Sequence, residues 1–267
     1  MKKTLAEENV ILKELQLNGT VTIKQAMDIL SISEATARRL FSRMEEKGLG
    51  IRSHGKITMP DSAYNFYRYD VSKELYVKEK KAISNYAVSF VKDGDVLFLD
   101  SGTTVCLFSM ALADALRQNI LKDIKVFTNS YMIINVLNEL ATVNLIGGTY
   151  RPNRKDFCGY MTEKNISDCH FDKCFLGTDG YTSEFGFTTT EFESAKICET
   201  AIKASDVTII LTDFHKFGNK ALVSFSNGLD ITAVITDNRL SQAKLKELHG
   251  LGFNVKIAKN ERNAQNV

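Results

Sequence analysis

Short apolar runs that end in small polar residues recur along most of the chain after residue 95. Segments between them carry apolar residues at helical spacing. The expected strands are 96–99, 124–127, 143–146, 173–176, 207–211, 231–235 and 253–257. Such alternation is typical of a parallel sheet with helices on both faces. The sequence therefore predicts an α/β fold whose larger domain holds a mostly parallel, doubly wound sheet.

One strand end has the composition of an anion-binding loop. The apolar run Val96–Leu99 is followed by Asp100–Thr104 and then by an amphipathic helix. Gly102 permits a tight turn, and Thr103 and Thr104 stand where the helix begins. The first turn of a helix offers free N–H groups and partial positive charge, which suit a phosphate. An ordinary N-cap explains the same residues, and this loop alone does not separate the two readings.

Polar residues also follow other predicted strands. Ligands of open parallel sheets bind beyond the carboxyl ends of the strands, although short connections favour the same residues for structural reasons. The repetition of these clusters near Arg151, Arg154, Lys216 and Lys220 favours a phosphorylated ligand. We expect Asp179 and Asp213 to accept hydrogen bonds from sugar hydroxyls and Lys216 to pair with the phosphate. The clusters include Thr128–Ser130, Gly147–Gly148, Gly177–Gly180 and Thr212–Asp213.

The first 58 residues predict three short helices and a β-hairpin. The first helix spans about 4–17 and ends at Asn18-Gly19, and Thr22 caps the second. The turn Ser31–Ser33 leads into a third helix, Glu34–Lys47, and 48–58 alternates apolar and polar residues around His54-Gly55. This is a helix-turn-helix followed by a wing.

The outward face of the third helix is polar and cationic. A solvated charged face is the simpler explanation, but the preceding turn favours a helix that contacts DNA bases and phosphates. Arginine offers a planar fork for guanine or phosphate. The wing would bring further basic groups to the duplex backbone. The expected DNA-binding residues are Thr22, Ser33, Thr36, Arg38, Arg39, Ser42, Arg43, Arg52, His54 and Lys56.

The segments Ser33–Arg39 and Arg52–Gly55 resemble the amino-terminal winged helix-turn-helix of the DeoR/GlpR family of bacterial transcriptional regulators. The chain departs from the family pattern at two points. Leu40-Phe41 follow the arginine pair where the family usually has Asp-Leu, and Lys56 stands where a second wing glycine is usual.

The C-terminal part resembles the DeoR sensor domain, which is similar in fold to ribose-5-phosphate isomerase and coenzyme A transferases. The matching segments are Leu99–Thr104, Thr128–Ser130, Gly147–Gly148, Asp179–Gly180 and Asp213–Gly218, and the resemblance covers about residues 1–240. It implies a homo-oligomeric repressor of an operon for uptake and breakdown of a carbohydrate, with a phosphorylated sugar or polyol as effector. The expected effector-binding residues are Asp100, Ser101, Gly102, Thr103, Thr104, Thr128, Asn129, Ser130, Gly147, Gly148, Arg151, Asp179 and Lys216.

The expected domain organisation has four parts: a DNA-binding domain at 1–58, a linker at 59–77, a sensor domain at 78–260 and a tail at 261–267. The linker contains aromatic residues that we expect to pack between domains or subunits. A base-stacking surface is less favoured because no basic groove surrounds them. These residues are Tyr64, Phe66, Tyr67, Tyr69 and Tyr76.

Composition excludes several classes of protein. The net charge is +2, with +3 in residues 1–60 and −1 in the remainder. No apolar run approaches the roughly 18 residues of a membrane span, and the N-terminal residues do not resemble a signal peptide, so a cytoplasmic location is expected. Five cysteines without a C-x-x-C pair indicate reduced thiols. Cys169, His170 and Cys174 lack a fourth ligand, so neither a metal nor a cofactor is expected.

Two other functional classes remain as alternatives. A sugar-phosphate isomerase needs a positioned carboxylate base. The isomerases of this fold usually carry Asp-Gly-Ala-Asp-Glu where this chain has Asp179–Glu184, in which only Asp-Gly is retained. An architectural DNA-binding protein without effector would leave the strand-end clusters unexplained. The sequence therefore predicts a regulator and not an enzyme.

Overall fold

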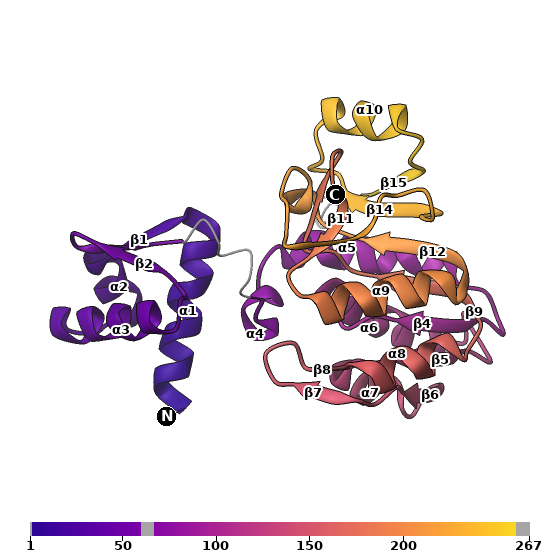
Figure 1. Ribbon diagram of the computed structural model, residues 1–267. Coiled ribbons are helices and arrows are strands. Elements are labelled where there is room, and N and C mark those ends of the chain that lie inside the picture. The colour runs from indigo at the N-terminus through magenta and orange to yellow at the C-terminus, as the bar shows by residue number, and fades with distance from the viewer. Residues whose placement is uncertain (1, 60–66, 260–267) are drawn as a thin grey trace, which may run out of the picture. The chain divides into compact units, whose positions relative to one another are not determined.

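The computed structural model describes residues 2–59 and 67–259 (Figure 1). The chain divides into two compact units, 1–75 and 76–267, each described here by itself. The expected tail at 261–267 and two aromatic residues of the expected linker, Tyr64 and Phe66, lie outside the described residues. Among the helices described, none combines the length and apolar character needed to cross a bilayer.

The first unit is a winged helix-turn-helix. Its elements are α1 (Lys2–Asn18), β1 (Thr20–Thr22), α2 (Ile23–Leu30), α3 (Glu34–Glu46), β2 (Ile51–Ser53), β3 (Lys56–Thr58) and α4 (Tyr69–Ser72). The strands form an antiparallel sheet in the order β1-β3-β2. The hairpin β2–β3 was predicted, whereas β1 was not, because three residues are too few to show alternation.

Local capping fixes the turn between α2 and α3. The Thr22 hydroxyl accepts from the Gln25 amide, and the Gln25 side chain accepts from the Thr22 amide, which makes a capping box. Ser31 ends α2 in the left-handed conformation, with φ 52°, and Ser33 caps α3 by accepting from the Thr36 amide. The third helix then buries one face against α1 and α2. The core residues of α3 are Ala37, Leu40, Phe41 and Met44.

The second unit alternates helices and strands. In chain order it begins with α5 (Val77–Ala87), η2 (Val88–Phe90), β4 (Val96–Leu99), α6 (Thr103–Arg117), β5 (Lys125–Thr128), α7 (Tyr131–Leu137), β6 (Thr142–Leu145), β7 (Thr149–Arg151), β8 (Asp156–Cys158) and α8 (Tyr160–Ser167). It continues with β9 (Phe171–Leu176), β10 (Gly180–Thr182), β11 (Gly186–Thr189), α9 (Phe192–Lys203), β12 (Ser205–Leu211), η3 (Phe214–Lys216), β13 (Val223–Ser226), β14 (Ala233–Asp237), α10 (Gln242–Gly250) and β15 (Val255–Ala258).

Within residues 67–259, seven of these strands form one sheet in the order β15-β14-β12-β9-β4-β5-β6, and every neighbouring pair is parallel. Figure 1 shows α5 and α6 on one face of this sheet and α8 and α9 on the other. The inner strand β4 buries Leu97, Phe98 and Leu99 completely, because both of its faces are covered. The predicted α/β fold with a doubly wound parallel sheet is confirmed.

Two antiparallel additions were not predicted. The hairpin β7–β8 follows β6, and β10, β11 and β13 form a small sheet. Their strands have only three or four residues, and β10 and β11 begin with glycine, so none offers a long apolar run. Gly186 shows why one glycine is needed: its φ is 70°, and a Cβ there would collide with the backbone of Ser226.

The parallel topology brings the polar strand ends together at one edge of the sheet. Leu99, Thr128, Leu176, Leu211 and Asp237 are the last residues of β4, β5, β9, β12 and β14. Because parallel strands point the same way, the residues that follow them lie at the same edge, where ligands of such folds bind. The candidate site is built there.

Candidate anion site and nucleic-acid interface

The amino-terminal end of α6 is open. Gly102 is the N-cap, with φ −61° and ψ 150°, and its carbonyl accepts from the Cys106 amide at 2.8 Å. In the part of the chain that the structure describes, no acceptor is found for the N–H groups of Thr103, Thr104 and Val105. These groups and the dipole of a 15-residue helix make this point attractive to an anion.

Lys80 of α5 reaches the same point. Its ammonium donates to the hydroxyl of Thr103 at 3.0 Å, and the residue is only 4% exposed. Burial, the largest cause, and the charge of Lys216 lower the pKa of Lys80 to about 8, while the charge of Asp213 opposes the shift. A cation is thus held beside the positive end of a helix, an arrangement that an anion would stabilise.

Sequence reasoning missed Lys80. Lys80 was not assigned to any site, although three and seven residues further on are Ile83 and Ala87, both fully buried. A lysine at helical spacing with core residues is the signal that could have identified it, because a buried lysine is rare without a partner.

Lys216 lies near Lys80, in the turn after β12. It ends η3, which Asp213 caps: the Asp213 carboxylate accepts from the His215 amide at 3.1 Å. Lys216 lowers the pKa of both Lys80 and Asp179, so its charge lies within electrostatic reach of both groups. The structure therefore brings the predicted Lys216 together with Lys80 and two carboxylates.

Asp179 is held in one orientation. Its Oδ2 accepts from Arg154 at 3.1 Å, from the Thr189 hydroxyl at 2.9 Å and from the Thr190 amide at 3.1 Å. Burial by itself would raise the pKa of Asp179, but Arg154, Lys216 and these hydrogen bonds outweigh it and lower the pKa. Among the described residues no donor is found for Oδ1. An ionised carboxylate with one committed oxygen can accept from a ligand hydroxyl through the other.

Arg151 is neutralised by carboxylates. Its guanidinium donates to both oxygens of Asp156, at 2.9 and 2.7 Å, and to Glu191 at 2.5 Å. Burial lowers the pKa of Arg151, but the hydrogen bond and charge of Asp156 more than offset it. Asp156 also accepts from the Ser101 hydroxyl at 2.8 Å. This chain of contacts ties the β7–β8 hairpin to the loop before α6.

Asp100 joins that loop to β9. Its amide donates to the Phe175 carbonyl at 3.1 Å, and its carboxylate accepts from the Gly177 amide at 3.3 Å. Burial raises the pKa of Asp100, while the amides of Ser101 and Gly177 partly oppose the rise. The role of Asp100 in this structure is to hold two strand ends together.

Thr128 at the end of β5 and the following Asn129 and Ser130 are fully buried. The Thr128 hydroxyl donates to the Leu99 carbonyl at 2.6 Å, the Asn129 side chain donates to the Phe157 carbonyl at 3.0 Å, and Ser130 caps α7. A Cβ on Gly148 would collide with the Thr162 hydroxyl and the Cys158 carbonyl, so glycine is required there for packing. The Gly147 carbonyl accepts from Thr162 at 3.0 Å. These contacts organise the strand ends, and the proposed ligand contacts of these residues stay predictions.

The first unit presents the predicted DNA-binding residues mainly on α3 and the wing. Arg38 and Arg39 are exposed on α3, and Arg38 pairs with Glu34 at 2.7 Å. The hydroxyls of Ser33 and Thr36 lie 2.9 Å apart at the start of this helix. In the wing, Arg52, His54 and Lys56 are all exposed.

Four predicted DNA-binding residues have additional partners within the unit. Arg52 donates to the Ser42 hydroxyl, which links the wing to α3. Arg43 lies 4.0 Å from Glu8, a fully buried carboxylate that also pairs with Lys47 at 2.7 Å. Thr22 belongs to the capping box of α2. Arg39 is therefore the arginine whose side chain has no ion pair within residues 2–59.

Comparison with known proteins identifies both units. The family described as DeoR C terminal sensor domain matches residues 76–238, and the DeoR-like helix-turn-helix domain matches residues 8–63. Together these matches extend over most of the sequence.

The chain belongs to the DeoR family. A lactose phosphotransferase system repressor of Lactococcus lactis subsp. lactis is 33% identical over 240 residues, which are 89% of this chain and 92% of that relative. The HTH-type transcriptional regulator GlpR of Haloferax volcanii is 30% identical and covers 88% of this chain and 90% of its own. The family membership and the winged helix-turn-helix predicted from the sequence are confirmed.

The DeoR relatives also bear on the alternative of an enzyme. Those reported above are named as transcriptional regulators, which agrees with the predicted class. A solved ribose 5-phosphate isomerase A from Methanocaldococcus jannaschii is similar at 18% identity with a TM-score of 0.38, over 52% of this chain and 53% of that chain.

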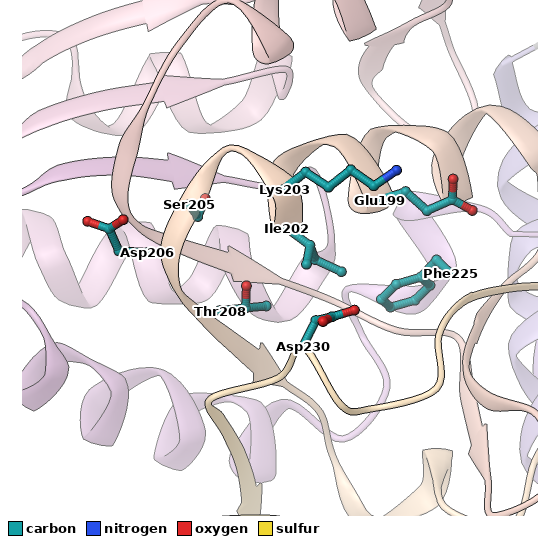
Figure 2. Close-up of a pocket in the computed structure, with 8 residues that line it drawn as sticks. All are labelled: Glu199, Ile202, Lys203, Ser205, Asp206, Thr208, Phe225 and Asp230. Carbon is teal, nitrogen blue, oxygen red and sulfur yellow. The ribbon is translucent and has the colours of Figure 1, made fainter.

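A hollow of about 400 Å³ lies elsewhere on the sensor unit. Figure 2 shows it beside α9 and the beginning of β12. Its lining residues are Glu199, Ile202, Lys203, Ser205, Asp206, Thr208, Phe225 and Asp230. Because Ser205 is the first residue of β12, this hollow is at the end of the sheet opposite to the candidate anion site.

Proposed function

We propose that this DeoR-family chain is a sequence-specific DNA-binding repressor of an operon for carbohydrate uptake or breakdown. Its effector is a phosphorylated sugar or polyol, bound at the carboxyl ends of the parallel strands. The observation that carries this proposal is the position of Lys80 against the open amino-terminal end of α6, with Lys216 close by.

A phosphate ester fits this site by charge. A sugar phosphate carries up to two negative charges near neutral pH, and the site offers two ammonium groups and the free N–H groups of the first turn of α6. Asp179 and Asp213 stand close enough to influence the pKa of Lys80 and are suited to accept from hydroxyls. A free sugar would offer no negative charge to these two ammonium groups.

For the first unit, we propose that α3 enters the major groove and that the wing contacts the DNA backbone. A homo-oligomer would present two such units to two half-sites, about one helical turn or a multiple of it apart. A DNA partner of this kind implies action in the cytoplasm. The modest excess of positive charge in residues 1–60 supports phosphate contacts.

Regulation follows from linkage between the two sites. An effector changes DNA affinity only if it binds one arrangement of the protein better than another. A coupling free energy of about 1–3 kcal/mol, typical of such systems, corresponds to a change in operator affinity of about 5- to 150-fold. The lactose phosphotransferase system repressor among the relatives supports a carbohydrate operon as the target.

A thermal-shift panel tests the effector class. Pentose, hexose and polyol phosphates are each compared with the unphosphorylated parent compound. A ligand present at 100 times its dissociation constant adds about 2.7 kcal/mol of stability. We expect stabilisation by at least one phosphate ester and by none of the parents. Stabilisation by a parent alone, or by no compound in a broad panel, would contradict the proposal.

A matched pair of variants locates the binding site. Lys80→Met removes the buried cation, and Lys81→Met removes an exposed one from the neighbouring position of α5. The phosphate-dependent shift should be lost in Lys80→Met and retained in Lys81→Met. An equal shift in both variants would place the phosphate elsewhere.

A further inference from the structure

The chain leaves the first unit through a short hydrogen-bonded segment. Val71 of α4 is 1% exposed and belongs to the core of the first unit. After α4, the Lys73 amide donates to the Tyr69 carbonyl at 2.9 Å, and the Leu75 amide donates to the Ser72 carbonyl at 3.2 Å. Leu75 is the last residue of that unit and Tyr76 the first of the next. The backbone of Tyr76 is therefore a joint between two locally ordered segments.

Tyr76 has an uncommon backbone conformation for its residue type. Its φ of 51° and ψ of 40° lie in the left-handed region, which bulky side chains disfavour. It is the N-cap of α5, and its carbonyl accepts from the Lys80 amide at 3.0 Å. One helical turn thus separates this joint from the buried cation of the anion site.

The ring of Tyr76 contacts the other cationic segment of the site. It stacks on His215 with ring centres 4.8 Å apart and an interplanar angle of 27°, and it meets the edge of Phe214 at 5.5 Å. Both residues belong to η3, whose last residue is Lys216. Tyr76 is therefore joined to Lys80 through the backbone and to Lys216 through η3.

Three further contacts hold η3 and the start of α5 in place. The Phe214 amide donates to Asp237 at 2.8 Å. The guanidinium of Arg239 lies 4.1 Å from the Phe214 ring centre and pairs with Glu79 of α5 at 2.9 Å. These contacts tie Phe214 to the last residue of β14 and connect η3 with the start of α5 through Arg239.

We propose that Tyr76 is the positioning residue that transmits phosphate binding at Lys80 and Lys216 to the joint between the two units. This inference deepens the proposed function and depends on its anion site. A phosphate that pairs with both lysines draws the start of α5 and η3 together, and the stacked ring converts that approach into a change at the Tyr76 backbone. The left-handed conformation is then one of two positions of the joint, with phosphate changing their populations.

Hydrogen exchange of the full chain, with and without inorganic phosphate, tests this transmission. Peptides covering Thr103–Val105 report binding, and peptides covering 73–80 report the joint. Tyr76→Phe keeps the ring and is the matched control for Tyr76→Ala, while Tyr76→Leu keeps bulk without an aromatic face. We expect phosphate to slow exchange at Thr103–Val105 in all four proteins and to change exchange at 73–80 only in the wild type and Tyr76→Phe.

The outcomes distinguish a failure of the transmission through Tyr76 from a failure of the anion site. A phosphate-dependent change at 73–80 that persists in Tyr76→Ala or Tyr76→Leu overturns the role of the ring. Slowed exchange at Thr103–Val105 with no change at 73–80 in the wild type overturns the transmission and leaves the anion site intact. No response at Thr103–Val105 in the wild type overturns the anion site, and this inference with it. If Tyr76→Ala does not fold, Tyr76→Leu decides.

Discussion

Lys80 and Thr103 are joined by a hydrogen bond of 3.0 Å that links the first half of α5 to the first residue of α6. Both residues are more than nine-tenths buried, so the ammonium is held where the helix dipole is positive. Burial, the largest cause, lowers the pKa of Lys80 to about 8, and the charge of Lys216 acts in the same direction, so a bound anion would stabilise the charged form.

The variant Lys80→Met should be more stable than the wild type when no ligand is present. Lowering a lysine pKa from 10.5 to about 8 costs up to about 3 kcal/mol in the protonated form, and methionine avoids that cost. The cost applies fully below pH 8 and disappears as the pH rises to about 10.5. We therefore expect a gain of about 1–3 kcal/mol in the free energy of unfolding at pH 7, measured with urea. A loss of stability at pH 7 would contradict the assigned burial cost, and Lys81→Met should change little.

Phosphate affinity should fall as the pH rises through about 8. Lys80 is protonated below that pH and neutral above it, whereas a phosphate ester is already a dianion above pH 7. Bound phosphate raises the pKa of Lys80, so affinity falls by at most about tenfold per pH unit. Isothermal titration between pH 7 and pH 9.5 measures the slope. Lys80→Arg, which stays charged throughout, should remove the slope, and a slope equal to that of the wild type would assign it to another group.

Removing Arg39 should weaken DNA binding. Its side chain is exposed on α3 and has no ion pair within residues 2–59, so it is available to a base or phosphate. Arg39→Ala should cost about 1–3 kcal/mol of affinity for an operator selected from random-sequence DNA by the wild-type chain. Arg117→Ala, which removes an exposed arginine from α6, should bind as the wild type does. Equal gel-shift affinities for all three proteins would remove α3 from the interface.

The pair Arg154–Asp179 should stabilise the sensor unit above pH 4. The pKa of Asp179 is lowered in the folded state, so its contribution is present above the unfolded pKa of about 3.8 and is lost as the pH falls through the folded value. Arg154→Met leaves a buried carboxylate without its cation and should cost about 3–5 kcal/mol.

The double variant Arg154→Met/Asp179→Asn is the control for that pair. It should cost less than the sum of the two single variants, because the second change removes the uncompensated charge. Additive costs in urea unfolding would show that the two side chains do not interact in solution.

Much of the fold was predictable from periodicity. The apolar run Val96–Leu99 and its counterparts identified the parallel strands, and Thr22 and Ser33 marked the starts of α2 and α3. These signals are local. The antiparallel strands β10, β11 and β13 escaped prediction because they are short, and because the pairing of β11 with β13 joins residues far apart in the sequence, such as Phe187 with Ser226.

The site was predictable only in part, for a physical reason. Polar residues after a strand can hold the backbone or a ligand, and sequence does not separate these uses. Thr128 and Ser130 hold strand and helix ends, and Arg151 is neutralised by Asp156, whereas Lys216 lies near the open helix end. Lys80 belongs to a helix outside every strand-end cluster, and only the tertiary fold brings it to Thr103.

The most direct test of effector-dependent DNA binding is fluorescence anisotropy of labelled operator DNA. The DNA is titrated with the full chain in the presence and absence of the phosphate ester that stabilises the protein most in the thermal-shift panel. The account predicts a change in operator affinity of about tenfold in the wild type. It predicts no change with the unphosphorylated parent and none in Lys80→Met. Equal operator affinity with and without the phosphate ester in the wild type, or an equal response in Lys80→Met, would contradict it.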